Sequence, residues 1–266
     1  MVSYQKSTLR EDVSLLTDQQ TQQYQEDGYV IPDFRLSPET VTNIKKHHQR
    51  FIEQYPEFID YCPAVLAYDL GFLNYARQPE ILDMVEQILG SNIALWNSSF
   101  FAKPVHQGKK TPWHQDGEYW PIRPLATCTV WMAIDPSTTD NGCLRVIPGS
   151  HKDQRLKGHT QNEDPNLSLS MELNASEFDE TSAVDLVLES GQISLHDVYL
   201  AHGSEANTSN QPRRGLTLRF MPTTSVYDRR ILPPSSRPGR LSMTERSLFL
   251  MRGQDVSEQN DFLLRY

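Results

Sequence analysis

The residues with the clearest chemical potential lie in one short segment, 112–120, with the sequence PWHQDGEYW. On an extended backbone, side chains two positions apart point to the same face, so His114 and Asp116 can address one point while Gln115 turns away. Two imidazoles and one carboxylate on one face of an octahedron are the ligand set of non-haem iron(II) oxygenases. A His-x-Asp tripeptide alone is a weak signal, and the third ligand must come from elsewhere. Our candidate is His202, in the later stretch LHDVYLAHGS, at an expected strand end.

Other side chains near these candidates have competing interpretations. Because the three-ligand site is then complete, we expect His151 and His196 to support the fold or the ligands rather than to bind metal. Tyr119 and Trp120 follow the ligands directly and are predicted to contact substrate at the pocket mouth, with core positions as the alternative. Arg123 is a candidate partner for an anionic group of the substrate. Three lysines before the segment are expected to belong to a solvated loop: Lys103, Lys109 and Lys110.

Four motifs follow one another along the chain. They are HQD at 114–116 with YWP at 119–121, NGCL at 141–144, PGSH at 148–151, and HGSEANTSNQPR from His202 to Arg213. In this combination, over about residues 92–222, the chain resembles the phytanoyl-CoA dioxygenase family of iron(II)- and 2-oxoglutarate-dependent oxygenases, which also includes ectoine hydroxylase. The resemblance implies that His114, Asp116 and His202 hold the metal.

The resemblance also implies roles for other residues. Arg213, eleven positions after His202, would pair with the distal carboxylate of 2-oxoglutarate, because a guanidinium matches a carboxylate with two parallel hydrogen bonds. Arg214 is the competing candidate, but the family's spacing favours Arg213, and an adjacent strand residue points to the opposite face. Four more residues are predicted to line the same pocket, the last two with ordinary strand positions as the alternative: Ser204, Trp131, Asn97 and Ser99.

The implied reaction uses iron(II) as cofactor and 2-oxoglutarate and O2 as co-substrates. It yields succinate and carbon dioxide and hydroxylates a substrate C–H bond, and next to nitrogen the product loses a carbon fragment, which is an oxidative dealkylation. Related halogenases have a small residue in place of the carboxylate ligand. Asp116 therefore predicts hydroxylation and not halogenation.

The substrate is set by loops and not by the fold. Polar residues near the expected pocket favour a small polar metabolite, and a tailoring step in natural-product biosynthesis is our hypothesis. The last residues, LLRY, do not form a peroxisomal address, which argues against phytanoyl-CoA itself. Three alternatives stay open: a catalytically silent sensor that binds 2-oxoglutarate or metal, a hydroxylase of an acyl-CoA or other lipid-like substrate, and a sugar-binding or structural jelly roll with incidental histidines.

The elements that must position these residues are mainly β-strands with flanking helices. Helices are expected within 17–54, interrupted by an extended piece at 29–32, and at 79–89 before Gly90. Surface loops are expected at 159–180 and 227–246. The predicted fold is a double-stranded β-helix, or cupin-like jelly roll, in one dioxygenase domain, 1–266, with a helical flank at 1–90, a core at 91–222 and a C-terminal extension at 223–266. The candidate strands are 93–103, 127–134, 143–147, 184–188, 192–196 and 215–221.

The composition narrows the classes of partner and compartment. A formal charge of −9 over 266 residues argues against a nucleic-acid partner, which needs clustered cations. No apolar run reaches the length of a membrane span. Three cysteines without a CxxC spacing indicate no disulfide framework, so a reducing compartment and a cytoplasmic enzyme are expected. No pattern indicates a protein partner, and a small-molecule substrate is predicted.

Overall fold

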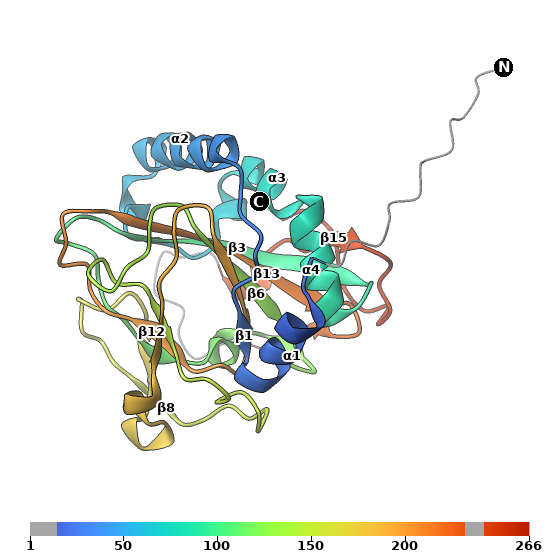
Figure 1. The fold of residues 1–266 in the computed structure, drawn as a ribbon. Coiled ribbons are helices and arrows are strands. Elements are labelled where there is room, and N and C mark those ends of the chain that lie inside the picture. Colours follow the sequence, from blue (N-terminus) through green and yellow to red (C-terminus); the bar gives the residue numbers. More distant parts are fainter. Residues whose placement is uncertain (1–14, 232–241, 266) are drawn as a thin grey trace.

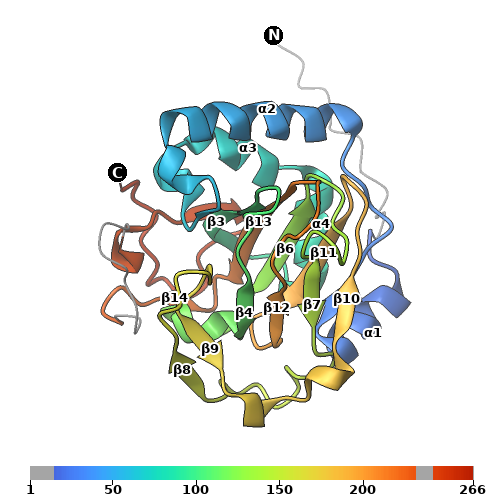
Figure 2. The ribbon, with the colours of Figure 1, turned by 90° about the vertical axis from the view of Figure 1, so that its left-hand side faces the viewer.

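The structure is a computed structural model that describes residues 15–231 and 242–265 of the chain. Two β-sheets face each other, and helices cover the outer side of the larger sheet (Figures 1 and 2). This arrangement confirms the predicted mainly β jelly roll with flanking helices. None of the helices in the described part combines the length and apolar character needed to cross a membrane.

The larger sheet contains seven antiparallel strands in the order β1-β11-β6-β13-β3-β15, with β2 paired to β3 off this path. Its two longest strands pair along their whole length, from Arg213 opposite Lys103 to Pro222 opposite Ile93. The strands are β1 (Tyr29–Val30), β2 (Tyr61–Cys62), β3 (Ile93–Lys103), β6 (Cys128–Ala133), β11 (Ile193–Asp197), β13 (Arg213–Pro222) and β15 (Phe249–Arg252).

The smaller sheet contains four antiparallel strands in the order β10-β7-β12-β4. Figure 2 shows β4, β12, β7 and β10 as a layer beside β3, β13, β6 and β11. These four strands are β4 (Thr111–His114), β7 (Leu144–Val146), β10 (Val184–Leu186) and β12 (His202–Ser204). Two short strand pairs lie outside both sheets: β5 (Ile122–Arg123) with β14 (Val226–Tyr227), and β8 (His159–Gln161) with β9 (Met171–Leu173).

The helices begin at residues that satisfy their free backbone N–H groups. Thr17 forms a capping box with Gln20 before α1 (Asp18–Asp27), and the Ser37 side chain accepts from the Thr40 N–H before α2 (Pro38–Gln54). A short α3 (Leu73–Ala76) precedes α4 (Pro79–Leu89), which starts with proline and ends at Gly90, where φ is +86°.

The helices bury their apolar sides against the outer face of the larger sheet. In one continuous core, Ile44 and Phe51 of α2 and Met84 of α4 join Leu216 and Leu218 of β13, all nearly inaccessible to solvent. Burial of this apolar surface is the main term that holds the helices in place. The opposite face of β13 is therefore turned toward the smaller sheet.

One irregularity changes which side chains face the smaller sheet. The pairing of β13 with β3 shifts register between Arg219 and Phe220, so Arg219 lies opposite Asn97 while Phe220 lies opposite Leu95. Trp96 is the extra residue of this bulge. Leu95 packs in the helix-facing core, whereas Trp96 packs in a second core.

Most elements lie where the sequence predicts them. The helix predicted at 79–89 and the strand predicted at 93–103 have these bounds, and the break at 29–32 contains β1. The stretch 159–180 contains the β8 and β9 pair in addition to loop. Much of the loop predicted at 227–246, namely 232–241, lies outside the described residues. The stretch 223–266 contributes β15, which pairs with β3 in the larger sheet.

Candidate metal centre and its cavity

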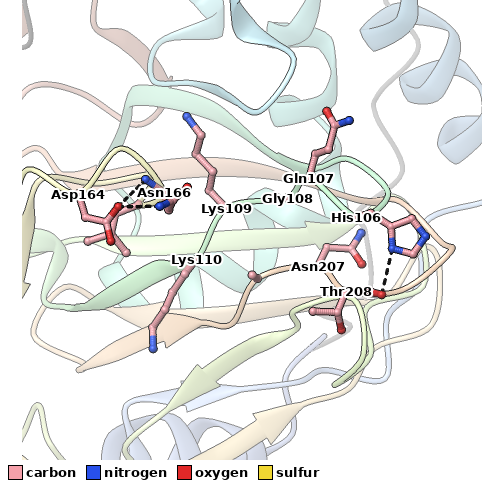
Figure 3. Close-up of a pocket in the computed structure, with 11 residues that line it drawn as sticks. His106, Gln107, Gly108, Lys109, Lys110, Asp164, Asn166, Asn207 and Thr208 are labelled. Atoms are coloured by element: carbon pink, nitrogen blue, oxygen red, sulfur yellow. Dashed lines mark hydrogen bonds between the residues drawn. The ribbon is translucent and has the colours of Figure 1, made fainter.

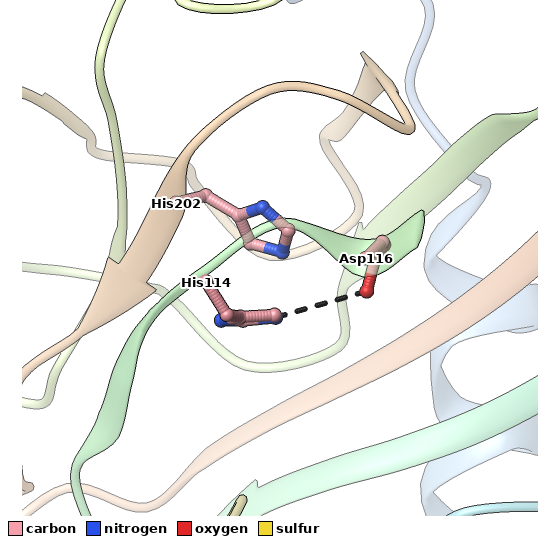
Figure 4. A group of neighbouring side chains, drawn as sticks. All are labelled: His114, Asp116 and His202. Carbon is pink, nitrogen blue, oxygen red and sulfur yellow. Dashed lines mark ion pairs between the residues drawn. The ribbon is translucent and has the colours of Figure 1, made fainter. Parts of the chain in front are cut away.

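His114, Asp116 and His202 meet because two strands of the smaller sheet pair with each other. His114 is the last residue of β4 and lies directly opposite His202, the first residue of β12. Asp116 follows at the start of a 3-10 turn (Asp116–Tyr119), after Gln115 in an extended conformation. One potential ligand atom from each of the three residues lies within 4.8 Å of the other two (Figure 4). The structure therefore brings together the three side chains that the sequence singled out.

The backbone fixes which imidazole nitrogen of each histidine is available. His114 Nδ1 lies 2.8 Å from the Pro112 carbonyl oxygen, and His202 Nδ1 lies 2.9 Å from the Leu200 carbonyl oxygen. A carbonyl oxygen only accepts, so each Nδ1 carries the hydrogen and each Nε2 keeps its lone pair. His114 Nε2 lies 3.7 Å from Asp116 Oδ1. Two imidazole nitrogens and a carboxylate, all buried, fit a divalent transition metal.

The charge states of Asp116 and His202 also fit metal binding. Burial by itself raises the pKa of Asp116, but the charge of Arg219 and the neighbouring imidazoles of His114 and His196 outweigh it and hold this pKa well below its usual range. The Thr129 hydroxyl donates to Asp116 Oδ2 at 3.4 Å. Burial, and then the neighbouring His114, lower the pKa of His202 well below its usual range. Asp116 is therefore ionised and His202 neutral near pH 7, the forms in which both bind metal.

Arg213 lies in the same cavity as the three ligands, at the start of β13. Its guanidinium is buried, lies 5.4 Å from the Trp131 ring centroid, and donates to the Phe101 carbonyl at 3.2 Å. Its Nε has no hydrogen-bond partner in the described structure. Burial lowers the pKa of Arg213 to about 10, so the side chain stays cationic near pH 7. Ser204 and Trp131, both predicted to line this pocket, do line the cavity.

Asn97 and Ser99 have different surroundings from those two residues. Asn97 Nδ2 donates to the Pro63 carbonyl at 3.0 Å and to Ser99 Oγ at 3.1 Å. Ser99 Oγ donates to the same carbonyl at 3.0 Å and accepts from Arg219 Nη1 at 2.5 Å. Both side chains therefore have protein partners already, and their contact with 2-oxoglutarate stays a prediction.

The three predicted substrate contacts lie in three different environments. The Tyr119 hydroxyl donates to the Met171 carbonyl and accepts from the Met171 N–H, each at 3.1 Å, which ties the segment after the ligands to β9. Trp120 is buried, with its ring centroid 4.6 Å from that of Trp96. Arg123 is exposed and donates to the carbonyls of Trp120 and Ile122. Substrate contact by these residues stays a prediction, and none of the three is among the residues that line the cavity of the metal cluster.

Two histidines predicted to be non-ligands lie outside the three-residue cluster. His196 lines the cavity with Nε2 3.6 Å from Asp116 Oδ2, and neither ring nitrogen has a hydrogen-bond partner in the described structure. His151 lies further off, with Nε2 3.1 Å from the Gln25 carbonyl. His196 is thus placed to support Asp116, and His151 ties a loop to α1.

The sequence interpretation missed several cavity residues, above all Arg219. Its Nη2 lies 3.9 Å from Asp116 Oδ1. A signal was available, because Arg219 is six positions after Arg213 and even spacings on a strand share a face. The other cavity-lining residues that were not singled out are Phe101, Thr111, Thr129, Leu144 and Thr217.

The expected solvated lysine loop is wrong for Lys103. This side chain is buried, and its ammonium donates at 2.5 Å to the carbonyls of Lys109 and Glu205. Lys109 and Lys110 line a surface pocket with His106, shown in Figure 3. Lys103 is therefore held between two loops. Because Lys103 lies opposite Arg213 in the sheet, it also helps to fix the end of β13 that carries Arg213.

Comparison with known proteins identifies the family. A sequence model of the family described as Phytanoyl-CoA dioxygenase (PhyH) matches residues 24–215. The chain is 34% identical over 165 residues to the peroxisomal phytanoyl-CoA dioxygenase of Homo sapiens, a match that covers 60% of this chain and 48% of the human protein. The chain therefore spans about half the length of this curated relative.

Two solved structures share the fold. The apo form of the non-heme monooxygenase ThoJ superposes with a TM-score of 0.72 at 23% identity, covering 92% of this chain and 87% of ThoJ. The epimerase SnoN, solved in complex with Fe3+, alpha ketoglutarate and nogalamycin RO, superposes with a TM-score of 0.66 at 19% identity, covering 90% of this chain and 96% of SnoN. Since the family model covers well over half of the chain, including both segments that carry the three ligands, the chain belongs to the phytanoyl-CoA dioxygenase family.

Proposed function

We propose that this protein is an iron(II)- and 2-oxoglutarate-dependent dioxygenase that hydroxylates, or oxidatively dealkylates, a small polar metabolite. The observation that carries the proposal is the combination of the buried cluster His114, Asp116 and His202 with the buried, incompletely paired Arg213 in one cavity. Family membership and the similarity to a structure that contains Fe3+ and alpha ketoglutarate support it.

Bound iron(II) would supply the activation of O2, coupled to the conversion of 2-oxoglutarate into succinate and carbon dioxide and to oxidation of a substrate C–H bond. The chain's own residues prepare the site. The Pro112 and Leu200 carbonyls orient the two imidazoles, and Arg213 binds and orients the distal carboxylate of 2-oxoglutarate. The packed walls around Asp116 exclude water from its carboxylate.

The place of the reaction and its chemistry have further support. We assign the enzyme to the cytoplasm, which fits a chain whose three cysteines, Cys62, Cys128 and Cys143, are all buried thiols. A tailoring step in biosynthesis is the context we propose. Asp116 provides a carboxylate where halogenases have a small residue, which supports hydroxylation.

The decisive experiment measures succinate formation from 2-oxoglutarate by anaerobically iron-loaded protein after oxygen is admitted. Wild type is compared with His114→Ala and Arg213→Ala, with and without a panel of small polar metabolites. We expect turnover in wild type, stimulated by one metabolite and lost in both variants. No succinate despite bound iron and 2-oxoglutarate would favour the sensor, and turnover of fatty acyl thioesters alone would favour a lipid-like substrate.

A further inference from the structure

Two further buried guanidiniums, those of Arg219 and Arg246, lie beyond the one assigned to 2-oxoglutarate. Along β13, Arg213, Gly215, Thr217 and Arg219 occupy alternate positions and share the face turned toward the smaller sheet, while Leu216 and Leu218 pack in the helix-facing core. Six residues of strand span about 20 Å. The two arginines therefore belong to opposite ends of the cavity face.

Arg219 is fixed in place but not fully paired. Its Nη1 donates to Ser99 Oγ at 2.5 Å, and its guanidinium carbon lies 5.1 Å from the Trp120 ring centroid. Its Nε has no hydrogen-bond partner in the described structure. The carboxylate nearest to it is Asp116, at 3.9 Å, and Asp116 is committed to the metal cluster.

Arg246 is the second member of the pair and comes from the C-terminal stretch. It is 6% exposed, and neither Nε nor Nη1 has a partner among the described residues. Its guanidinium carbon lies 6.0 Å from the Trp96 ring centroid, and the Trp96 ring contacts Trp120 edge to face, at 4.6 Å between centroids. Arg219 lies opposite Asn97 in the sheet, and Asn97 and Arg246 line one small cavity, so the two arginines lie close to each other. Burial lowers the pKa of Arg246.

Two buried guanidiniums with free N–H groups are costly unless an anion satisfies them, because burial removes both from water. Asp116 is the only carboxylate among the described residues that line the metal cavity, and the one carboxylate among those that line the small cavity of Arg246, Glu245, is exposed. We infer that Arg219 and Arg246 bind an oxyanion group, a carboxylate or a phosphonate, of the primary substrate. Two planar guanidinium groups can donate charge-assisted hydrogen bonds to such an oxyanion, and the rings of Trp96 and Trp120 would flank it.

This inference rests on the proposed function and narrows the substrate to small anionic metabolites. Because Arg219 is the member of the pair nearest Asp116, a substrate held there by its oxyanion extends its carbon chain toward the metal cluster. Arg213 keeps its separate role at the other end of the face. The enzyme thus binds its two organic reactants through different arginines.

The test is isothermal titration calorimetry on the full chain loaded with nickel(II) and saturating 2-oxoglutarate, which occupy the metal ligands and Arg213 without turnover. The probes are propylphosphonate and butyrate, with 1-butanol and propylammonium as neutral and cationic controls. We expect saturable binding of one equivalent of an anion and none of either control. Tighter propylphosphonate would identify a phosphonate site, and tighter butyrate a carboxylate site.

Arg246→Gln should weaken binding of the anion at least about tenfold, the effect of losing a charged hydrogen-bond donor. Arg214→Gln removes a cation from the same strand as Arg219 but outside the cavity, and should bind the anion like wild type. If circular dichroism shows that Arg246→Gln is unfolded, Arg246→Lys takes its place. Lysine keeps the charge but lacks the planar guanidinium, so this variant should show a smaller loss of affinity for the anion.

Absence of anion binding to wild type, or equal affinity in wild type and the folded Arg246 variant, would overturn the inference. Either result would leave the proposed function intact, because nickel(II) and 2-oxoglutarate binding are measured in the same samples. Conversely, protein that binds propylphosphonate through Arg246 but forms no succinate would refute the oxygenase and retain the anion site.

Discussion

Arg213 and Arg214 are neighbours in β13, yet their guanidiniums have different partners on opposite faces of the sheet. Arg214 forms two hydrogen bonds with Asp135, at 2.7 and 2.8 Å, whereas Arg213 is buried beside Trp131 in the cavity of the metal cluster. Because adjacent strand residues point to opposite faces, Arg214 forms a structural ion pair while Arg213 keeps N–H groups available for a ligand. The distinction decides which arginine is available to 2-oxoglutarate.

The first prediction compares these two neighbours. Arg213→Gln should raise the dissociation constant for 2-oxoglutarate about thirtyfold or more, because a buried charge-assisted pair is lost. Arg214→Gln should leave that constant within about threefold of the wild-type value. It should instead lower the free energy of unfolding by about 1 kcal/mol, because the lost ion pair with Asp135 is partly exposed and therefore modest in strength. Calorimetry on manganese(II)-loaded protein and urea unfolding measure the two effects. The reverse ranking of 2-oxoglutarate affinities would show that Arg214 holds the co-substrate.

The second prediction separates ligands from their support. Asp116→Ala should abolish cobalt(II) binding, followed by visible absorption, because the only carboxylate of the cluster is removed. His196→Gln should weaken it by about ten- to a hundredfold, the usual effect of losing a partner of a ligand, since His196 Nε2 lies 3.6 Å from Asp116. If His196→Gln lost cobalt(II) binding as completely as Asp116→Ala, the result would identify His196 as a metal ligand.

The third prediction concerns the approach of Trp131 to β13. A Cβ atom on Gly215 would lie 2.4 Å from the Trp131 indole, so Gly215→Ala must displace a ring that lies beside Arg213. We expect a loss of about 1–3 kcal/mol in the free energy of unfolding and weaker 2-oxoglutarate binding. Trp131→Phe in the same chain should recover part of both losses. If the cost of Gly215→Ala is the same in both backgrounds, the contact with Trp131 is not its cause.

How far the sequence predicts this site depends on the range of the contacts. The alternation that distinguishes Arg213 from Arg214 is local and was predicted, and so was the shared face of His114 and Asp116. The meeting of His114 with His202 depends on the pairing of β4 with β12, which is non-local. The residues alone offered His202 only as a candidate third ligand, and the family motifs then assigned it that role.

The residues that were missed depend on irregular or distant structure. The bulge between Arg219 and Phe220 changes which residues of β3 face the cavity, and no local pattern marks its position. Arg246 comes from a stretch interpreted as loop, and only the folded chain brings it to Trp96. Lys103 was expected in solvent because lysine is seldom buried, yet backbone carbonyls hold its ammonium.

The fourth prediction is a pH dependence of stability that originates at His48. This α2 side chain is 2% exposed, neither ring nitrogen has a partner in the described structure, and its ring lies 4.2 Å from that of Phe100. Burial, and then the charge of Arg214, lower the pKa of His48 to about 4.

The direction of the pH effect follows from these values. The unfolded chain binds a proton at a pKa of about 6.5, and the folded chain only near 4, so the unfolded state holds more protons between these values. The contribution of His48 is therefore fully present above pH 6.5 and is lost as the pH falls toward 4, by about 3 kcal/mol in all. We expect urea unfolding of the chelator-treated protein to show a steeper loss of stability in wild type than in His48→Phe. The exposed His106, changed to Gln, should retain the wild-type slope, and a His48→Phe curve parallel to wild type would rule out His48 as the source.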